Sequence, residues 1–227
     1  MNIKQEFYDV VILGSGGAGL TAAINLIKNK YKILVISKNS TTKSHTAAAQ
    51  GGINAPLGNM GSDNVDWFIY DTVKSSDYLA DHDAVETLCK NANEAINELA
   101  AFGVNFNQNE LGEIYQREYG GQTTEFGCGE NAKRACGVGD KTGESIVAKL
   151  YLEAKNLGVK FAENIFAHKL ITDDNKAEAI IAYNLEKDEH IIYNTSNVII
   201  ATGGYAGLYR SNTAANICTG DGIAIAY

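Results

Sequence analysis

Proline is almost absent from this sequence: Pro56 is the single one among 227 residues, against 23 glycines. The glycines have no three-residue period, which excludes a collagen-type chain. No run of 18 residues is apolar, so no segment is predicted to cross a bilayer. The first seven residues lack the apolar core of a signal peptide. Glycine at this density is instead typical of nucleotide-binding α/β proteins, whose backbone must approach phosphates closely.

Positive charge is also in deficit. The chain has 19 Lys and Arg against 27 Asp and Glu, a net charge of −8, and no basic stripe interleaved with aromatic residues. This balance argues against a nucleic-acid partner. The four cysteines form no CxxC pair and have no histidine at zinc spacing, so we expect reduced, structurally buried thiols and no metal site. They are Cys89, Cys128, Cys136 and Cys218.

The first forty residues carry a βαβ pattern. Residues 8–13 form a short apolar run that ends in glycines, as a buried parallel strand does. Residues 18–28 have apolar side chains at helical spacing, and residues 32–37 make a second buried strand. The pattern predicts an α/β fold with a doubly wound parallel sheet.

Residues 41–77 are rich in Ser, Thr, Gly and Asn, and we expect long ligand-binding loops there with a short helix at 65–73. Two amphipathic helices are predicted at 83–102 and 142–157. In the first, the predicted inner face consists of Val85, Leu88, Ala92, Ala95, Leu99 and Phe102. In the second, it consists of Ile146, Val147, Leu150, Tyr151 and Ala154.

Residues 160–193 alternate apolar and polar side chains, which predicts a strand followed by an antiparallel β-meander. Residues 197–201 read as one more buried strand, ending in Gly203-Gly204. A final helix begins near Ile223 and stops at Tyr227. Because that helix is barely started, we expect residues 1–227 to be one domain of a longer protein.

The segment Gly14-Ser15-Gly16-Gly17-Ala18-Gly19 matches the pattern GxGxxG between the first strand and the first helix. In that context Gly14 permits the tight turn, Gly16 lets the backbone touch a pyrophosphate, and Gly19 allows close packing. The helix N-terminus adds free N–H groups and a favourable dipole. The motif predicts a Rossmann-like dinucleotide site.

The second strand departs from the usual dinucleotide pattern. It should end in an Asp or Glu that holds a ribose hydroxyl, but it ends in Ser37-Lys38. Ser37 can still bond a ribose or a phosphate, and Lys38 can pair with a phosphate. The departure argues against a generic NAD site.

His45 lies in the run Ser44-His45-Thr46-Ala47-Ala48-Ala49-Gln50-Gly51-Gly52. By itself, a histidine among small residues is most simply a hydrogen-bonded loop side chain. The run, however, resembles the SHT-x-x-AQGG stretch of succinate dehydrogenase and fumarate reductase flavoproteins. The resemblance continues in order along nearly the whole chain, at Asn64 and at 70–74, 76–78, 114–117, 120–122, 140–143, 201–204 and 219–222.

The resemblance implies bound FAD, joined covalently to the His45 side chain. The bond is expected to raise the flavin's reduction potential. The implied cofactor contacts are Gly14, Ser15, Gly16, Gly17, Ala18, Gly19, Ser37, Lys38, Ser44, His45, Thr46, Ala49, Gln50, Gly51, Gly52, Ala201, Thr202, Gly203 and Asp221. Gln50, Gly51 and Tyr119 match positions near the dicarboxylate substrate.

The implied activity is oxidation of succinate to fumarate, or the reverse, within the tricarboxylic acid cycle or an electron-transport chain. Electrons would pass to an iron–sulfur subunit and on to quinone, in a complex with membrane anchor subunits. The expected location is peripheral, on the cytoplasmic face of the inner membrane or the matrix side in mitochondria. The family's acid/base arginine and its capping domain lie beyond Tyr227, so no catalytic residue is expected within this chain.

Several residues leave alternatives open. Tyr119 stands where most relatives have Phe, Glu144 replaces a common His, and residues 125–139 depart from the pattern, which leaves the substrate open. An L-aspartate oxidase-like enzyme with non-covalent FAD shares the glycine motif but typically lacks the histidine, and an inactive truncated fragment is the third possibility.

The remaining candidates are most simply read as structural. His82, His168 and His190 are expected to be surface or structural residues. Arg117 and Arg134 are expected in surface pairs, and Trp67 in a core or interface.

Overall fold

The computed structural model describes residues 3–227. Contacts divide the chain into two compact units, one formed by residues up to 48 together with 146–227 and the other by residues 49–145. One helix, α5 (Thr142–Asn156), begins in the second unit and continues in the first.

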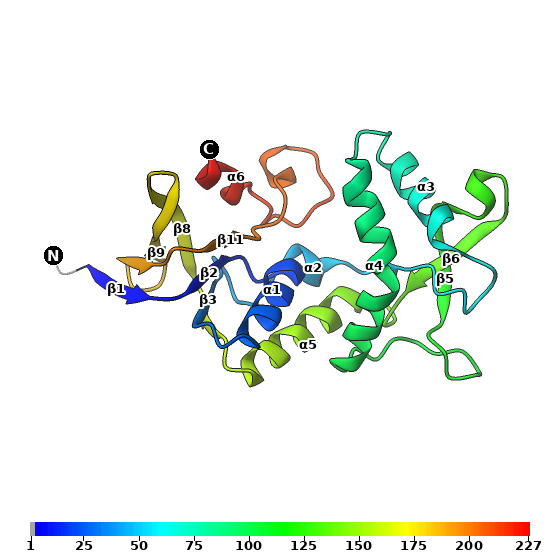
Figure 1. Ribbon diagram of the computed structural model, residues 1–227, viewed down its shortest axis with the longest axis horizontal. Coiled ribbons are helices and arrows are strands. Elements are labelled where there is room, and N and C mark those ends of the chain that lie inside the picture. Colours follow the sequence, from blue (N-terminus) through cyan, green and yellow to red (C-terminus); the bar gives the residue numbers. More distant parts are fainter. Residues whose placement is uncertain (1–2) are drawn as a thin grey trace. The chain divides into compact units, whose positions relative to one another are not determined.

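The first unit is built on a four-stranded parallel sheet. Its order is β11 (Val198–Ile200), β2 (Val10–Leu13), β3 (Ile33–Ile36) and β7 (Lys160–Ala162). All residues of β2 and β3 are buried, as expected of central parallel strands, and α1 (Gly17–Ile27) connects them (Figure 1). The predicted βαβ unit is confirmed.

A second sheet completes this unit, in the order β1 (Lys4–Phe7), β10 (Glu189–Asn194), β9 (Lys176–Asn184) and β8 (Ile165–Asp173). The β8–β9–β10 meander is antiparallel, as predicted. One core joins the two sheets; it includes Val11 and Leu34 from the parallel sheet and Ile180 and Tyr193 from the meander. The α/β fold class is therefore confirmed.

Strand β1 escaped the sequence analysis. It pairs with β10 in parallel, but its sequence, KQEF, is polar, and three of its four residues are exposed. An edge strand that buries so little has no apolar run to reveal it. The predicted strand at 8–13 begins two residues later, at Val10.

The second unit contains two helices, α3 (Val65–Ser75) and α4 (His82–Ala101), and a three-stranded antiparallel sheet. The sheet order is β4 (Ile53–Asn54), β6 (Asn131–Cys136) and β5 (Gln116–Thr123). Both helices are capped at their N-termini, α3 by Asn64 and α4 by Asp81, whose side chains accept main-chain N–H bonds. The helices were predicted; the sheet was not.

The inner face of α4 differs from the prediction. Val85, Cys89 and Ile96 are buried, whereas Leu88 and Ala95 are exposed. Val85 and the half-buried Ala92 lie on the core side as predicted, whereas Cys89 and Ile96 are buried in place of their neighbours Leu88 and Ala95. Cysteine behaves as a small apolar residue, so Cys89 rather than Leu88 marks the core side. The predicted face of α5 is confirmed, with Ile146, Val147, Leu150 and Ala154 buried.

Arg134 contradicts its predicted surface role. Its side chain is fully buried, and its guanidinium makes a two-pronged ion pair with Asp63, at 2.7 and 2.8 Å, and a second pair with Asp71 at 2.6 Å. Gln122 accepts a further bond from the same group at 2.8 Å. This network fastens α3 to the β5–β6 hairpin in the centre of the second unit.

The four cysteines are free, and three of them are buried as expected. Cys128 is exposed, beside the short 3₁₀ turn η1 (Glu125–Gly127). Burial raises the pKa of the Cys136 thiol to about 12 and also raises that of Cys89. Because the thiolate is the reactive form, the buried thiols should be slow to react.

A titration with dithio-bis-nitrobenzoate should therefore give one fast-reacting thiol per native chain and four after denaturation. Cys128→Ser should remove the fast phase, whereas Cys89→Ser should leave it intact. A fast phase that survived in Cys128→Ser would contradict the burial of the other thiols.

Candidate cofactor site

The turn between β2 and α1 is closed by two glycines. Gly14 has a φ of +109°, and a Cβ there would lie 2.3 Å from the carbonyl oxygen of Ala201. A Cβ on Gly19 would lie 2.0 Å from the carbonyl oxygen of Gly14. Both positions are too close for any side chain, so these glycines let β2, α1 and the segment after β11 meet.

Gly16 is different, because space remains beside it. The nearest atom to a Cβ there would be Thr46 Oγ1 at 3.4 Å, an ordinary contact. Gly16 is the N-cap of α1 and offers no side-chain acceptor to the first N–H groups of the helix. The Gly17 N–H donates to Thr46 Oγ1 at 3.1 Å. Gly17 apart, the first N–H groups of the helix have no side-chain acceptor among residues 3–227, and a helix N-terminus of this kind beside a cleft is suited to an anion.

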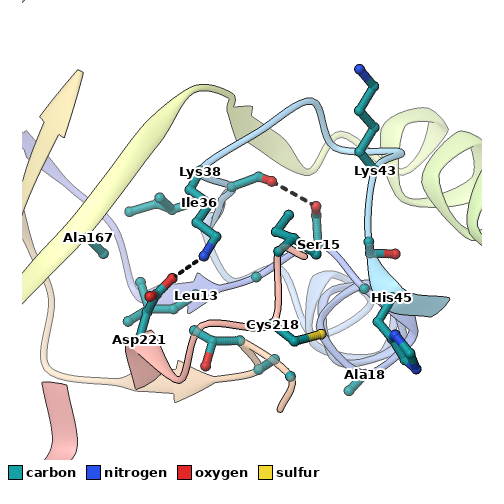
Figure 2. A pocket seen from close by; sticks show the side chains of 18 of the residues that line it. Leu13, Ser15, Ala18, Ile36, Lys38, Lys43, His45, Ala167, Cys218 and Asp221 are labelled. Atoms are coloured by element: carbon teal, nitrogen blue, oxygen red, sulfur yellow. Dashed lines mark hydrogen bonds and ion pairs between the residues drawn. The ribbon is translucent and has the colours of Figure 1, made fainter. Parts of the chain in front are cut away.

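These residues line a cleft within the first unit, shown in Figure 2. Most of the predicted cofactor contacts are brought together there: Gly14, Ser15, Gly16, Gly17, Ala18, Ser37, Lys38, Ser44, His45, Thr46, Ala201, Thr202, Gly203 and Asp221. Gly19 lies beneath the turn and is buried. Ala49, Gln50, Gly51 and Gly52 belong to the second unit.

The cleft also has an apolar wall that the sequence analysis missed. It is formed by Leu13, Ile36, Ile165, Phe166, Ala167, Ile217, Cys218 and Ile225. Leu13 and Ile36 end the two central parallel strands, where ligands of such sheets bind, and that rule could have identified them. The start of β8 and the residues around Cys218 follow no motif, and the chain topology alone places them there.

Two polar contacts link the elements around the cleft. Lys38, just after β3, pairs with Asp221 at the start of α6 (Asp221–Ala226), with Nζ 2.6 Å from Oδ2 (Figure 2). Thr219 bridges the pair by bonding both side chains. The Lys38 ammonium group, which was expected to pair with a phosphate, is thus already paired with the Asp221 carboxylate. The Ser15 and Ser37 hydroxyl oxygens lie 3.1 Å apart, and both residues are buried.

His45 begins a short helical turn, α2 (His45–Ala48), and its side chain is exposed at the cleft. Its Nδ1 accepts a hydrogen bond from the Ala215 N–H at 3.1 Å. An imidazole nitrogen that accepts carries no proton, so in the neutral ring the proton is on Nε2. The bond fixes the ring and leaves Nε2 without a protein partner among residues 3–227.

Comparison with known families identifies the group that such a cleft binds. The sequence profile described as "FAD binding domain" matches residues 9–227. The chain belongs to this FAD-binding family. The N-terminus of α1 and the room beside Gly16 suit a pyrophosphate, and the apolar wall suits an aromatic ring system. The residues present therefore fit the FAD of this family.

Relatives of this FAD-binding domain are flavoprotein subunits. It is 47% identical to the succinate dehydrogenase flavoprotein subunit of Rickettsia conorii, over 97% of this chain and 37% of that protein. It is 33% identical to the 8-methylmenaquinol:fumarate reductase flavoprotein subunit of Wolinella succinogenes, over 96% of this chain and 35% of that protein. The chain thus spans little more than a third of the length of these relatives.

Solved structures agree on the fold. The Mycobacterium smegmatis Sdh1 complex contains a chain that matches with a TM-score of 0.89 at 28% identity, covering 99% of this FAD-binding domain and 39% of that chain. The predicted resemblance to succinate dehydrogenase and fumarate reductase flavoproteins is confirmed at the level of the family.

In the second unit, the predicted substrate positions lie together. Arg117 donates to the Gly51 carbonyl oxygen at 2.7 Å. A Cβ on Gly51 would lie 3.1 Å from the Tyr119 hydroxyl oxygen, so the exposed tyrosine ring lies directly against this glycine. Gln50, beside it, is exposed.

Among residues 3–227, no helix combines the length and the apolar character needed to cross a bilayer. No three His, Cys, Asp or Glu side chains in that range cluster at metal-binding distance. His168 and His190 lie 5.5 Å apart, ring centre to ring centre, on the meander. Trp67 is half-buried on α3.

Proposed function

We propose that this chain holds FAD covalently and forms part of a flavoprotein subunit that interconverts succinate and fumarate. The glycine turn and the N-terminus of α1 would hold the pyrophosphate, because Gly16 leaves room there. Ser37, Lys38, Ala201–Gly203 and Asp221 line the rest of the cleft. We also assign Ala49, Gln50, Gly51 and Gly52 of the second unit to the cofactor, as the family resemblance implies.

His45 is the proposed attachment point, and the geometry of its ring carries this proposal. Nδ1 is occupied by the Ala215 N–H, so Nε2 is the nitrogen left to bond the cofactor. An imidazole substituted at Nε2 keeps its lone pair on Nδ1, and the Ala215 bond therefore suits the ring both before and after attachment. L-aspartate oxidase-like enzymes typically lack this histidine, so His45 favours the succinate dehydrogenase class.

FAD, when bound, would accept the two electrons of succinate oxidation as a hydride, and the second hydrogen would leave as a proton to a base outside this chain. The protein's part is to hold the ring system and exclude water. We place the dicarboxylate near Gln50, Gly51 and Tyr119; the tyrosine hydroxyl adds a hydrogen-bond donor where most relatives have a bare phenyl ring. The names of the relatives support both directions of the reaction.

The whole protein, longer than this chain, would pass electrons to an iron–sulfur subunit and then to quinone. We propose a peripheral position at the membrane, held by anchor subunits, on the cytoplasmic face of the inner membrane or the matrix side. The acid/base arginine of the family would come from the remainder of that protein.

The proposal is tested by measuring the flavin that stays on the protein after acid denaturation. Protein expressed with FAD, precipitated with acid and run on a denaturing gel should keep flavin fluorescence, because a covalent bond survives unfolding. His45→Ala should abolish the fluorescent band, and the control His82→Ala, at the exposed start of α4, should keep it. A fluorescent band from His45→Ala would overturn the attachment site.

A further inference from the structure

Thr41 lies in the loop between β3 and α2, yet it is 1% exposed. Its main-chain groups are both held by side chains from other parts of the first unit. Its N–H donates to Glu163 Oε1 at 2.7 Å, and its carbonyl oxygen accepts from Ser15 Oγ at 2.8 Å. No main-chain partner is found for either group among residues 3–227. Buried peptide groups are unfavourable when unpaired, so the position of the Thr41 peptide groups depends on these two side chains.

The backbone on both sides of Glu163 is fixed by hydrogen bonds. Strand β7 pairs with β3 in parallel, with Ile36 opposite Ala162, so Glu163 directly follows the last paired residue of β7. On each side of it the backbone is tied to Ser37: the Ser37 N–H donates to the Ala162 carbonyl at 2.9 Å, and the Ile165 N–H donates to the Ser37 carbonyl at 3.0 Å. Asn164, with a φ of +55°, makes the turn into β8.

The charge state of Glu163 suits it to hold an amide. The Thr41 hydroxyl, and after it the Thr41 amide, hold the pKa of this carboxyl below its usual value. An ionised acceptor makes a stronger bond to an N–H than a neutral one.

The loop that Thr41 anchors leads directly to the cofactor site. Ser15, which holds the Thr41 carbonyl, is part of the glycine turn. Four residues after Thr41 comes His45, and then Thr46, whose Oγ1 accepts from the Gly17 N–H. Among residues 3–227, two hydrogen bonds join residues 38–46 to the glycine turn: Ser15 to the Thr41 carbonyl oxygen, and Gly17 to Thr46. Loss of the Glu163 bond would leave the Thr41 N–H without its acceptor, while the Thr41 carbonyl oxygen stayed bonded to Ser15.

We propose that Glu163 is a positioning residue for the cofactor: through Thr41 and Ser15 it sets residues 38–46 against the glycine turn, with His45 in place for attachment. This inference rests on the proposed function of the cleft. Glu163 does not line the cleft and acts through Thr41.

The experiment compares wild type, Glu163→Gln and Glu163→Ala, with Glu178→Ala as control, an exposed glutamate whose side chain makes no described bond. Amide hydrogen exchange of residues 38–46 is measured in the cofactor-free chain. Glu163 is itself an exposed residue, so water screens its bond to Thr41, and Glu163→Ala should speed exchange there by a factor of about five to ten, as expected for one part-buried charge-assisted bond. Glu163→Gln should fall between, because its amide oxygen still accepts from Thr41. Exchange in β2 should not change.

The same variants are then loaded with FAD, and acid-stable flavin is divided by total bound flavin. A residue that only supports the fold would lower both amounts together and leave the ratio unchanged. Glu163→Ala should lower the ratio several-fold, and Glu163→Gln should restore part of it.

Exchange of residues 38–46 at the wild-type rate in Glu163→Ala would overturn the inference. If Glu163→Ala does not fold, the same comparison is made with Glu163→Gln, and wild-type exchange in that variant would be equally decisive. If wild type itself binds no FAD, the proposed function fails, and the exchange measurement still decides whether Glu163 holds the loop.

Discussion

Arg134→Met should lower the free energy of unfolding of the second unit by about 3–5 kcal/mol, because it leaves two buried carboxylates facing an apolar side chain. Asp63 and Asp71 are 3% and 1% exposed and have no other cation in the described ion pairs. Asp71 would keep its bonds from the Thr123 N–H and hydroxyl, at 2.7 and 3.0 Å, but not its countercharge.

The lone tryptophan makes this measurable. Trp67 lies on α3, between Asp63 and Asp71 in the sequence, so its fluorescence during urea unfolding reports on the surroundings of this network in the second unit. The exposed Arg210→Met in the first unit is the matched control and should shift the free energy by no more than about 0.5 kcal/mol.

A charge-neutral triple variant separates lost charge from lost packing. Arg134→Met combined with Asp63→Asn and Asp71→Asn removes the uncompensated carboxylates and should recover part of the loss. An unfolding midpoint equal to wild type in Arg134→Met would show that the network does not stabilise the unit.

Gly16→Val should abolish FAD binding, with at least a hundredfold loss of affinity, while leaving the fold intact. The Cβ meets no atom closer than 3.4 Å, and the Gly16 backbone, with φ −76° and ψ −174°, is extended and open to valine. The two added methyl groups would fill the space through which a pyrophosphate must approach the N-terminus of α1. Gly19→Ala, by contrast, should disrupt the turn itself.

Fluorescence titration of the cofactor-free chain with FAD measures this loss, and circular dichroism checks the fold. Gly120→Val is the matched control, because a Cβ there meets nothing within 4 Å and the residue lies outside the cleft. It should bind FAD as wild type does. FAD affinity unchanged in Gly16→Val would mean that the glycines serve only the turn.

The parts of the fold that could be predicted are those whose sequence is dictated by local physics. Buried parallel strands must be apolar throughout, which revealed β2 and β3, and the helices showed clear three-and-four spacing. The β5–β6 hairpin could not be recognised. Its first strand reads QREYGGQT, with two glycines and five exposed positions out of eight. Sheet pairing, rather than side-chain character, defines it.

The same distinction applies to the site. Residues of the glycine turn and of the Ser44–Thr46 run are close in sequence and carry motifs, so they could be named in advance. Glu163 and the apolar wall at Ile165–Ala167 are brought to the cleft region by the pairing of β7 with β3 and by the sheet contacts of β8. Arg134 was misread because its burial depends on two aspartates more than 60 residues away in sequence.

The position of β2 in the parallel sheet has a consequence for biosynthesis. One of its neighbours, β3, follows within the first 36 residues, but the other is β11, where Val198 pairs with Val11. While the ribosome is still making the intervening chain, β2 has a bare apolar edge, a feature that invites association with other strands. Thr202 and Asp221, which line the cleft, are also synthesised late, so the cleft is incomplete until most of the chain has left the ribosome. We expect chaperones to cover the exposed edge of β2 until β11 pairs with it.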